Sequence, residues 1–186
     1  FTAIAVYSDI KKTGELISSD KDLNQLFSNI FWGQRCNFLD VPTDCPQRDE
    51  RLGWTADAQV FARAAMYNFD VRRFFSKWLN DLSTDQYPNG TVPYIVPDVL
   101  DGSEEATSAA YGDAAVIIPW EMYRIYGDKK ILERQIDSMI AWVEYMHGYG
   151  EEEYLWLGHT QLGDWLHLDR LDNPDEIRRR DDFIAS

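Results

Sequence analysis

The sequence predicts an all-α fold in which consecutive helices form antiparallel hairpins. Several segments repeat apolar residues at the 3.6-residue spacing of an amphipathic helix. Capping residues and glycines mark where these segments begin and end, and the prolines of the longer connections exclude helix there. The 186 residues, 45% of them hydrophobic, allow one domain with a sizeable core.

The first elements follow from this pattern. Residues 1–16 alternate weakly in hydropathy, and we interpret them as an extended linker or the last strand of an upstream domain. Ser19 or Asp20 can cap the first helix, which is predicted to end near Cys36. Its apolar face comprises Leu23, Leu26, Phe27, Ile30 and Phe31.

A second helix is predicted from Trp54, and a third follows Phe69 and Asp70. The second is rich in alanine, which lets neighbouring helices approach closely. The predicted inward positions are Ala58, Phe61, Ala62, Ala65 and Met66 in the second helix, and Val71, Phe74, Phe75, Trp78, Leu79 and Leu82 in the third.

Residues 83–108 form a long irregular connection, because its prolines and glycines exclude a long helix. Val92–Val96 is predicted as a short strand. The apolar content of the connection favours an ordered loop packed over a site.

A fourth helix is predicted over residues 112–126, with a kink or a broken turn at Pro119 and its end at Gly127. Asp128 can cap a fifth, which ends near His147. The fifth helix has the most regular apolar stripe of the chain: Ile131, Leu132, Ile136, Met139, Ile140, Val143 and Met146.

Residues 149–161 are predicted as a loop or small hairpin, and residues 178–186 as the start of another helix. Some helices are apolar on nearly all sides, as in a double-layered helical toroid. Five helices and a short sixth do not close such a ring. We therefore expect residues 17–186 to be the N-terminal part of a larger toroidal domain.

Composition excludes several classes of partner. The net charge of −14 argues against nucleic acid and against an anionic membrane surface, since both need a basic patch. Aromatic residues make up 14% of the chain, which suits a neutral carbohydrate partner. No nucleotide or cofactor motif is present, so no cofactor is expected. Cys36 and Cys45 are predicted to be free thiols, with a bridge between them as the alternative.

The stretch from Asp44 to Asp57 is the candidate site. Its acids and arginines suit a polar pocket wall and not a core. Carboxylates bind hydroxyl groups and move protons, and the indole of Trp54 can cover the apolar face of a sugar. Glu50 and Asp57 are seven residues apart, so they would share a face if a helix continued between them; Trp54, four residues after Glu50, would lie there too.

Other interpretations of this stretch stay open on the residues alone. Its acids can favour a helix N-terminus while its arginines form surface pairs. Asp44, Asp49 and Asp57 could also bind calcium, although the spacing and glycine of an EF-hand loop are absent. The three histidines lack a metal-binding spacing and are interpreted as surface or structural residues: His147, His159 and His167.

The run from Phe38 to Gln59 closely resembles the α-L-rhamnosidases of glycoside hydrolase family 78. Further matches are residues 111–116, the pair Pro119-Trp120, and residues 163–166. The resemblance covers essentially the whole chain. It implies an (α/α)6 six-hairpin barrel, of which this chain is roughly the first half, and an inverting hydrolase for terminal α-L-rhamnosyl groups.

By the same resemblance, Glu50 is the general acid, Asp44 and Asp57 bind the rhamnose hydroxyls, and Trp54 lines the sugar pocket. Tyr111 and Trp165 occupy sugar-contacting positions, with inner-layer packing as the alternative for both. Ala56 departs from the family's pattern, which has glycine there.

The family's general base is a glutamate in the second half of the barrel, outside this chain, so the isolated chain is expected to be inactive. Two alternatives remain open. One is another (α/α)6 glycosidase whose 83–108 loop shapes a different sugar pocket. The other is a non-catalytic carbohydrate-binding domain with the same fold.

Overall fold

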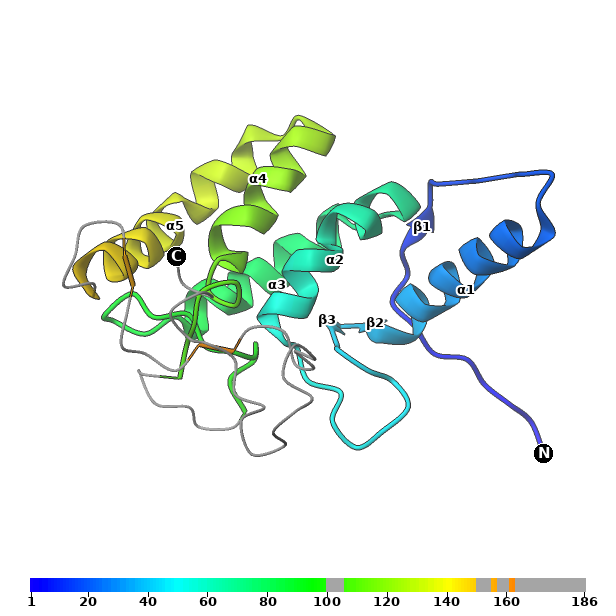
Figure 1. The fold of residues 1–186 in the computed structure, drawn as a ribbon, viewed down its shortest axis with the longest axis horizontal. Helices are drawn as coiled ribbons and strands as arrows, with labels where there is room; N and C mark the ends of the chain where they lie inside the picture. Colours follow the sequence, from blue (N-terminus) through cyan, green and yellow to red (C-terminus); the bar gives the residue numbers. More distant parts are fainter. Residues whose placement is uncertain (100–105, 150–154, 157–160, 163–186) are drawn as a thin grey trace, which may run out of the picture.

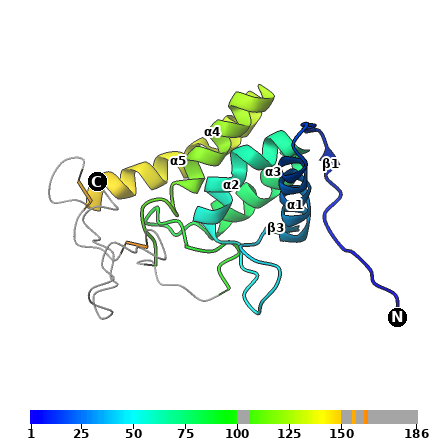
Figure 2. The same ribbon diagram turned by 45° about the vertical axis from the view of Figure 1, so that its right-hand side comes forward.

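The computed structural model describes residues 1–99, 106–149, 155–156 and 161–162, and this part of the chain is predominantly helical, as predicted (Figure 1). The connections that precede α2 and α4 lie together on one side of the helices in both views (Figure 2). The helices are α1 (Lys21–Asn37), α2 (Thr55–Asn68), α3 (Arg72–Asp85), α4 (Ala114–Tyr126) and α5 (Lys129–Tyr149).

Within the described residues, four two-residue strands pair in two antiparallel ribbons: β1 (Lys11–Lys12) with β4 (Phe69–Asp70), and β2 (Phe38–Leu39) with β3 (Val41–Pro42). Lys11 lies opposite Asp70 in the first ribbon. The extended N-terminal segment thus pairs with the α2–α3 connection. Whether it also leads from an upstream domain stays a prediction.

Helix α1 begins where the sequence predicts. The Asp20 side chain accepts hydrogen bonds from the backbone N–H groups of Asp22 and Leu23, which satisfies donors that the first turn leaves free. Its predicted apolar face is only partly covered, because Leu23 is 37% and Leu26 52% exposed.

Helices α2 and α3 supply much of the core; the predicted inward face of α3 is confirmed, and that of α2 is confirmed except that Phe61 is only partly buried. All six apolar positions of the α3 face are buried, including Trp78 and Leu79, which are fully enclosed. Phe38 of β2 stacks on Phe74 with ring centroids 4.4 Å apart. Alanines of α2 let α4 pack closely against it.

Helices α4 and α5 form the predicted hairpin. Gly127 ends α4 in the left-handed conformation, with φ 69°, which glycine adopts without a steric cost. Asp128 then accepts the N–H of Lys130 at 3.0 Å and caps α5. Helix α4 continues as one helix across Pro119, so the predicted broken turn is wrong.

The predicted apolar stripe of α5 is partly wrong. Its centre, Ile136, Ile140 and Val143, is between 44% and 52% exposed. Ile131 of the predicted stripe is buried, but the buried face is rotated and is completed by Gln135, Ser138 and Trp142. The physical reason is Trp142: its large ring is fully buried against the start of α4, and this contact fixes the rotation of the helix.

The α3–α4 connection is ordered over residues 86–99 and packs inward, with Val92, Ile95 and Val96 buried. The expected strand over Val92–Val96 reduces to a single antiparallel bridge between Ile95 and Trp54. Several further predictions lie outside the described residues: residues 100–105 of this loop, most of the predicted 149–161 hairpin, the 178–186 helix, His159 and His167. Across the described ranges, no helix combines the length and apolar character needed to cross a bilayer.

Candidate active site

Five of the six predicted site residues line one pocket. It has a volume of about 430 Å³ and lies between the α1–α2 connection, the start of α2 and the turn before α4. The sixth, Trp165, lies outside the described residues. The pocket is lined by Asp44, Arg48, Glu50, Trp54, Asp57, Tyr111 and Leu162.

The loop that carries the acids is closed on itself by Asp44. The Asp44 N–H donates to the Leu52 carbonyl at 3.0 Å, and Asp44 Oδ1 accepts the Leu52 N–H at 3.0 Å. Within this loop Arg51 adopts a left-handed conformation with φ 56°. The pair of hydrogen bonds between Asp44 and Leu52 therefore holds a strained loop with Glu50 near its end.

Glu50 lines the pocket, and both its oxygens have partners. Trp54 Nε1 donates to Oε1 at 2.9 Å, and the Arg48 guanidinium forms an ion pair with Oε2. Helix α2 begins only at Thr55, so the condition under which Glu50 and Asp57 would share one helical face, a helix continuing between them, is not met. The looped backbone nevertheless brings both acids and Trp54 to one pocket.

Sequence reasoning gave Arg48 no site role, although its position four residues after Asp44 and two before Glu50 is a usable signal. Its Nε donates to Cys45 Sγ at 3.2 Å, and its Nη2 lies 3.7 Å from Asp44 Oδ2. The thiol contact and the charge of Glu50 raise the pKa of Arg48, so it stays a cation. Arg48 thus neutralises part of the negative charge of the pocket.

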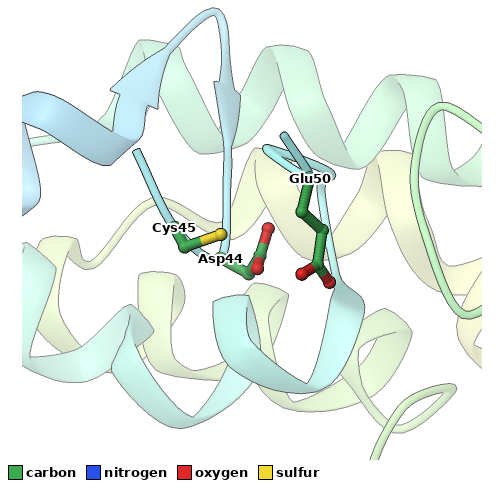
Figure 3. Close-up of side chains that lie close together, drawn as sticks. All are labelled: Asp44, Cys45 and Glu50. Carbon is green, nitrogen blue, oxygen red and sulfur yellow. The ribbon is translucent and has the colours of Figure 1, made fainter. Parts of the chain in front are cut away.

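Asp44, Cys45 and Glu50 form a group with the geometry to hold a metal ion (Figure 3). Each offers one ligand atom, and these atoms lie within 4.8 Å of one another. Arg48 contacts all three side chains, so its guanidinium supplies the positive charge there. The calcium grouping with Asp49 does not match this geometry, because Asp49 is exposed and does not line the pocket.

Both cysteines are free, as predicted, with Cys36 exposed and Cys45 buried.

Asp57 stands in the first turn of α2, where the helix dipole favours a negative charge. Although much of its residue surface is accessible, the surrounding protein removes water from the carboxyl group. This desolvation is the largest cause that raises the pKa of Asp57, and the nearby charges of Asp44 and Glu50 raise it further. A carboxyl group with a raised pKa in a pocket is typical of a functional site.

An aromatic wall faces these acids. The Trp54 and Tyr111 ring centroids are 5.9 Å apart, and Tyr94 lies 5.0 Å from Tyr111 and 6.4 Å from Trp54. The Tyr94 hydroxyl donates to the Thr107 carbonyl at 2.9 Å, which fixes this ring within the α3–α4 connection. The sequence singled out neither Tyr94 nor Leu162 as a site residue, and only the apolar character of the 83–108 loop pointed towards Tyr94.

Residues 11–186 match the family model described as the bacterial alpha-L-rhamnosidase 6 hairpin glycosidase domain. The chain belongs to this family. The resemblance carried by Phe38–Gln59 is therefore confirmed, as is the all-α six-hairpin fold class. Helices α1 to α5 correspond to part of that fold.

Proteins named alpha-L-rhamnosidases support the same assignment. An alpha-L-rhamnosidase of Formosa agariphila is 44% identical over 164 residues, which is 88% of this chain and 17% of that protein. One from an Alteromonas species is 45% identical over 160 residues, covering 86% of this chain and 17% of its own length. The chain therefore spans only a small part of these relatives.

Solved structures of rhamnosidases superpose closely. The Streptomyces avermitilis alpha-L-rhamnosidase complexed with L-rhamnose matches with a TM-score of 0.84 and 38% identity, over 96% of this chain and 16% of that one. The Aspergillus terreus enzyme gives 0.86 and 36%, over 98% of this chain and 21% of that one. At these identities the superposition supports a shared fold and a shared family.

Proposed function

We propose that this chain is the acid-bearing part of an inverting α-L-rhamnosidase that releases terminal α-L-rhamnosyl groups from glycosides or polysaccharides. Glu50 is the general acid, and the general base comes from residues outside the 186. The observation that carries the proposal is the position of Glu50, held by Trp54 and Arg48 in a pocket shared with Asp44 and Asp57.

In this mechanism protonated Glu50 gives its proton to the glycosidic oxygen as the bond from that oxygen to the anomeric carbon breaks. A water molecule on the opposite face of the ring loses a proton to the base and attacks the same carbon, which inverts its configuration. Such a pair of carboxyl groups stands ~6.5–9.5 Å apart, which leaves room for the water. Arg48 stabilises the carboxylate that Glu50 becomes after it has donated its proton.

The remaining pocket residues suit the binding of a neutral deoxysugar. Asp44 and Asp57 offer carboxylate oxygens to sugar hydroxyls, while Trp54 and Tyr111 offer ring faces to C–H groups. Neutral sugars are not repelled by a net charge of −14. The Streptomyces relative is described as a complex with L-rhamnose, which favours rhamnose among the possible sugars.

The test compares Glu50→Gln with Asp49→Asn in the full-length enzyme. Each substitution removes one negative charge, and the two acids are adjacent in the sequence, but only Glu50 lines the pocket. With an alkyl α-L-rhamnoside, whose leaving group needs protonation, we expect E50Q to lower kcat ~10²–10⁴-fold and D49N to change it less than about twofold. With a 2,4-dinitrophenyl rhamnoside, whose leaving group needs little protonation, the E50Q loss should be much smaller.

Proton NMR of the first sugar released decides the stereochemistry, and a retained anomeric configuration would contradict the inverting mechanism. Turnover by the 186-residue chain alone, abolished by E50Q, would contradict a base outside the chain. Hydrolysis of other aryl glycosides in place of rhamnosides would assign a different sugar. Rhamnose binding by the full-length protein without hydrolysis would favour a binding domain.

A further inference from the structure

The turn that presents Tyr111 to the pocket has an unusual backbone. Ala110, directly before Tyr111, adopts φ 67°, which places an ordinary L-residue in the left-handed region. The Gly112 N–H closes the turn on the Ser108 carbonyl at 3.1 Å. Because alanine disfavours this conformation, contacts elsewhere must hold it.

Asp113 supplies those contacts. Its Oδ2 accepts the backbone N–H of Ala110 at 2.8 Å, and its Oδ1 accepts the indole N–H of Trp142 at 2.9 Å. Each carboxylate oxygen thus has a donor, and Asp113 is not among the residues that line the pocket. It connects the backbone before Tyr111 to helix α5.

Trp142 completes the connection from behind the turn. Its side chain is fully buried, and a Cβ added to Gly112 would overlap its ring. The ring therefore lies directly against the backbone that follows Tyr111. The two residues beside Tyr111 are held by one cluster, Ala110 through Asp113 and Gly112 through the ring of Trp142.

We propose that Asp113 is a positioning residue for sugar binding, which acts through Ala110 to direct the Tyr111 ring into the pocket. The inference rests on the proposed function, since Tyr111 matters only if the pocket takes a sugar. Without Asp113, Ala110 relaxes to negative φ and the Cα–Cβ direction of Tyr111 changes. The result is a less complete aromatic wall beside Trp54 and Tyr94, with Glu50 left in place.

The test is a double-mutant cycle between Asp113→Ala and Tyr111→Ala in the full-length enzyme, with an aryl α-L-rhamnoside as substrate. Each single variant should raise KM ~10-fold and change kcat less than ~3-fold, because the ring contributes binding that is equal in ground and transition states. In the Y111A background, D113A should change KM by less than about twofold. Asp128→Ala, which removes a capping carboxylate at the exposed start of α5, is the matched control and should leave KM unchanged.

An equal D113A effect in both backgrounds would overturn the proposal, because the carboxylate would then act independently of Tyr111. An unchanged KM in D113A would do the same. If D113A does not fold, Trp142→Phe takes its place in the cycle, since it keeps an aromatic ring and removes the donor to Asp113 Oδ1 together with part of the buried ring. A wild-type enzyme without rhamnosidase activity would instead refute the proposed function, which separates the two failures.

Discussion

Replacing Gly53 by alanine tests how the α3–α4 connection supports the acid-bearing loop. A Cβ built on Gly53 would lie 2.1 Å from the Val96 carbonyl oxygen, whereas ordinary contact begins near 3.4 Å. The two backbones must therefore separate by about 1.3 Å, the difference between these distances. Gly53 directly precedes Trp54, so the shift would be felt at the donor to Glu50.

The energetic cost follows from what this separation breaks. Val96 N–H donates to the Gly53 carbonyl at 2.9 Å, and Trp78 Nε1 donates to the Val96 carbonyl at 3.0 Å. A separation of that size breaks the first hydrogen bond and strains the second, and each bond stabilises the fold by about 1 kcal/mol net. Together with the cost of overpacking, Gly53→Ala should lower the free energy of unfolding by about 2–4 kcal/mol.

Activity should fall more steeply than stability implies, because a misplacement of about 1 Å near the chemistry can reduce the rate ~10²-fold. The measurements are urea unfolding and kcat/KM of the full-length enzyme. Gly33→Ala is the matched control: this glycine lies within α1 with no atom near its Cβ position, so alanine should stabilise by about 0.5–1 kcal/mol. Wild-type stability and activity in G53A would refute the reasoning, and a loss of stability alone would mean that Val96 yields and the loop stays in place.

Three further predictions concern individual pocket residues. Burial and the charges of Asp44 and Glu50 raise the pKa of Asp57. Above about pH 4, the folded protein therefore binds more protons at Asp57 than the unfolded chain does. The free energy of unfolding then falls as pH rises. Asp57→Asn should therefore gain stability relative to wild type between about pH 4 and 7 in urea unfolding while its kcat/KM falls; a difference independent of pH would contradict this. Trp54→Phe keeps a ring but removes the donor to Glu50 Oε1, so kcat on an alkyl rhamnoside should drop ~5-fold and the drop should shrink with a dinitrophenyl leaving group. Titration with a thiol reagent should modify exposed Cys36 at once and buried Cys45 only on unfolding, and rapid reaction of both would disprove the burial of Cys45.

The helices could be predicted because their signals are local. Asp20 and Asp128 cap helices through their own side chains, and Gly127 ends one by its backbone freedom, so neighbouring residues decide each boundary. The α3 face was also predictable, since Phe74, Trp78 and Leu82 recur four residues apart on a helix with one apolar side.

Predictions failed where distant residues decide the outcome. The apolar stripe of α5 pointed to Ile136 and Ile140, but the helix is rotated so that Trp142 reaches Gly112 and Asp113, about thirty positions earlier in the chain. The Val92–Val96 strand failed for the same reason, because its partner is a single residue, Trp54, and not a second strand. Neither contact leaves a periodic trace in the sequence.

The candidate site contains both predictable and unpredictable features. Its residue types were identifiable because acids, arginines and a tryptophan are concentrated between Asp44 and Asp57. Their arrangement was not, because a shared face required a helix from Glu50 to Asp57, whereas the structure places Glu50 in a loop closed by Asp44 and Leu52. That closure depends on one backbone and one side-chain hydrogen bond between Asp44 and Leu52, which sequence spacing does not indicate.

Both walls of the pocket contain a residue whose backbone conformation destabilises the fold. Two residues next to the pocket have a left-handed backbone: Arg51 beside Glu50, and Ala110 beside Tyr111. This conformation costs an L-amino acid roughly 1–2 kcal/mol. Between these walls, Asp57 keeps a carboxyl group where burial and like charges disfavour its ionised form. Each feature destabilises the fold, and the two left-handed residues are held by side-chain contacts: Asp44 closes the loop of the first wall, and Asp113 with Trp142 holds the second. Packing alone does not explain why three destabilising features surround one carboxylate. Their convergence on Glu50 therefore favours a catalytic over a structural role for this part of the chain.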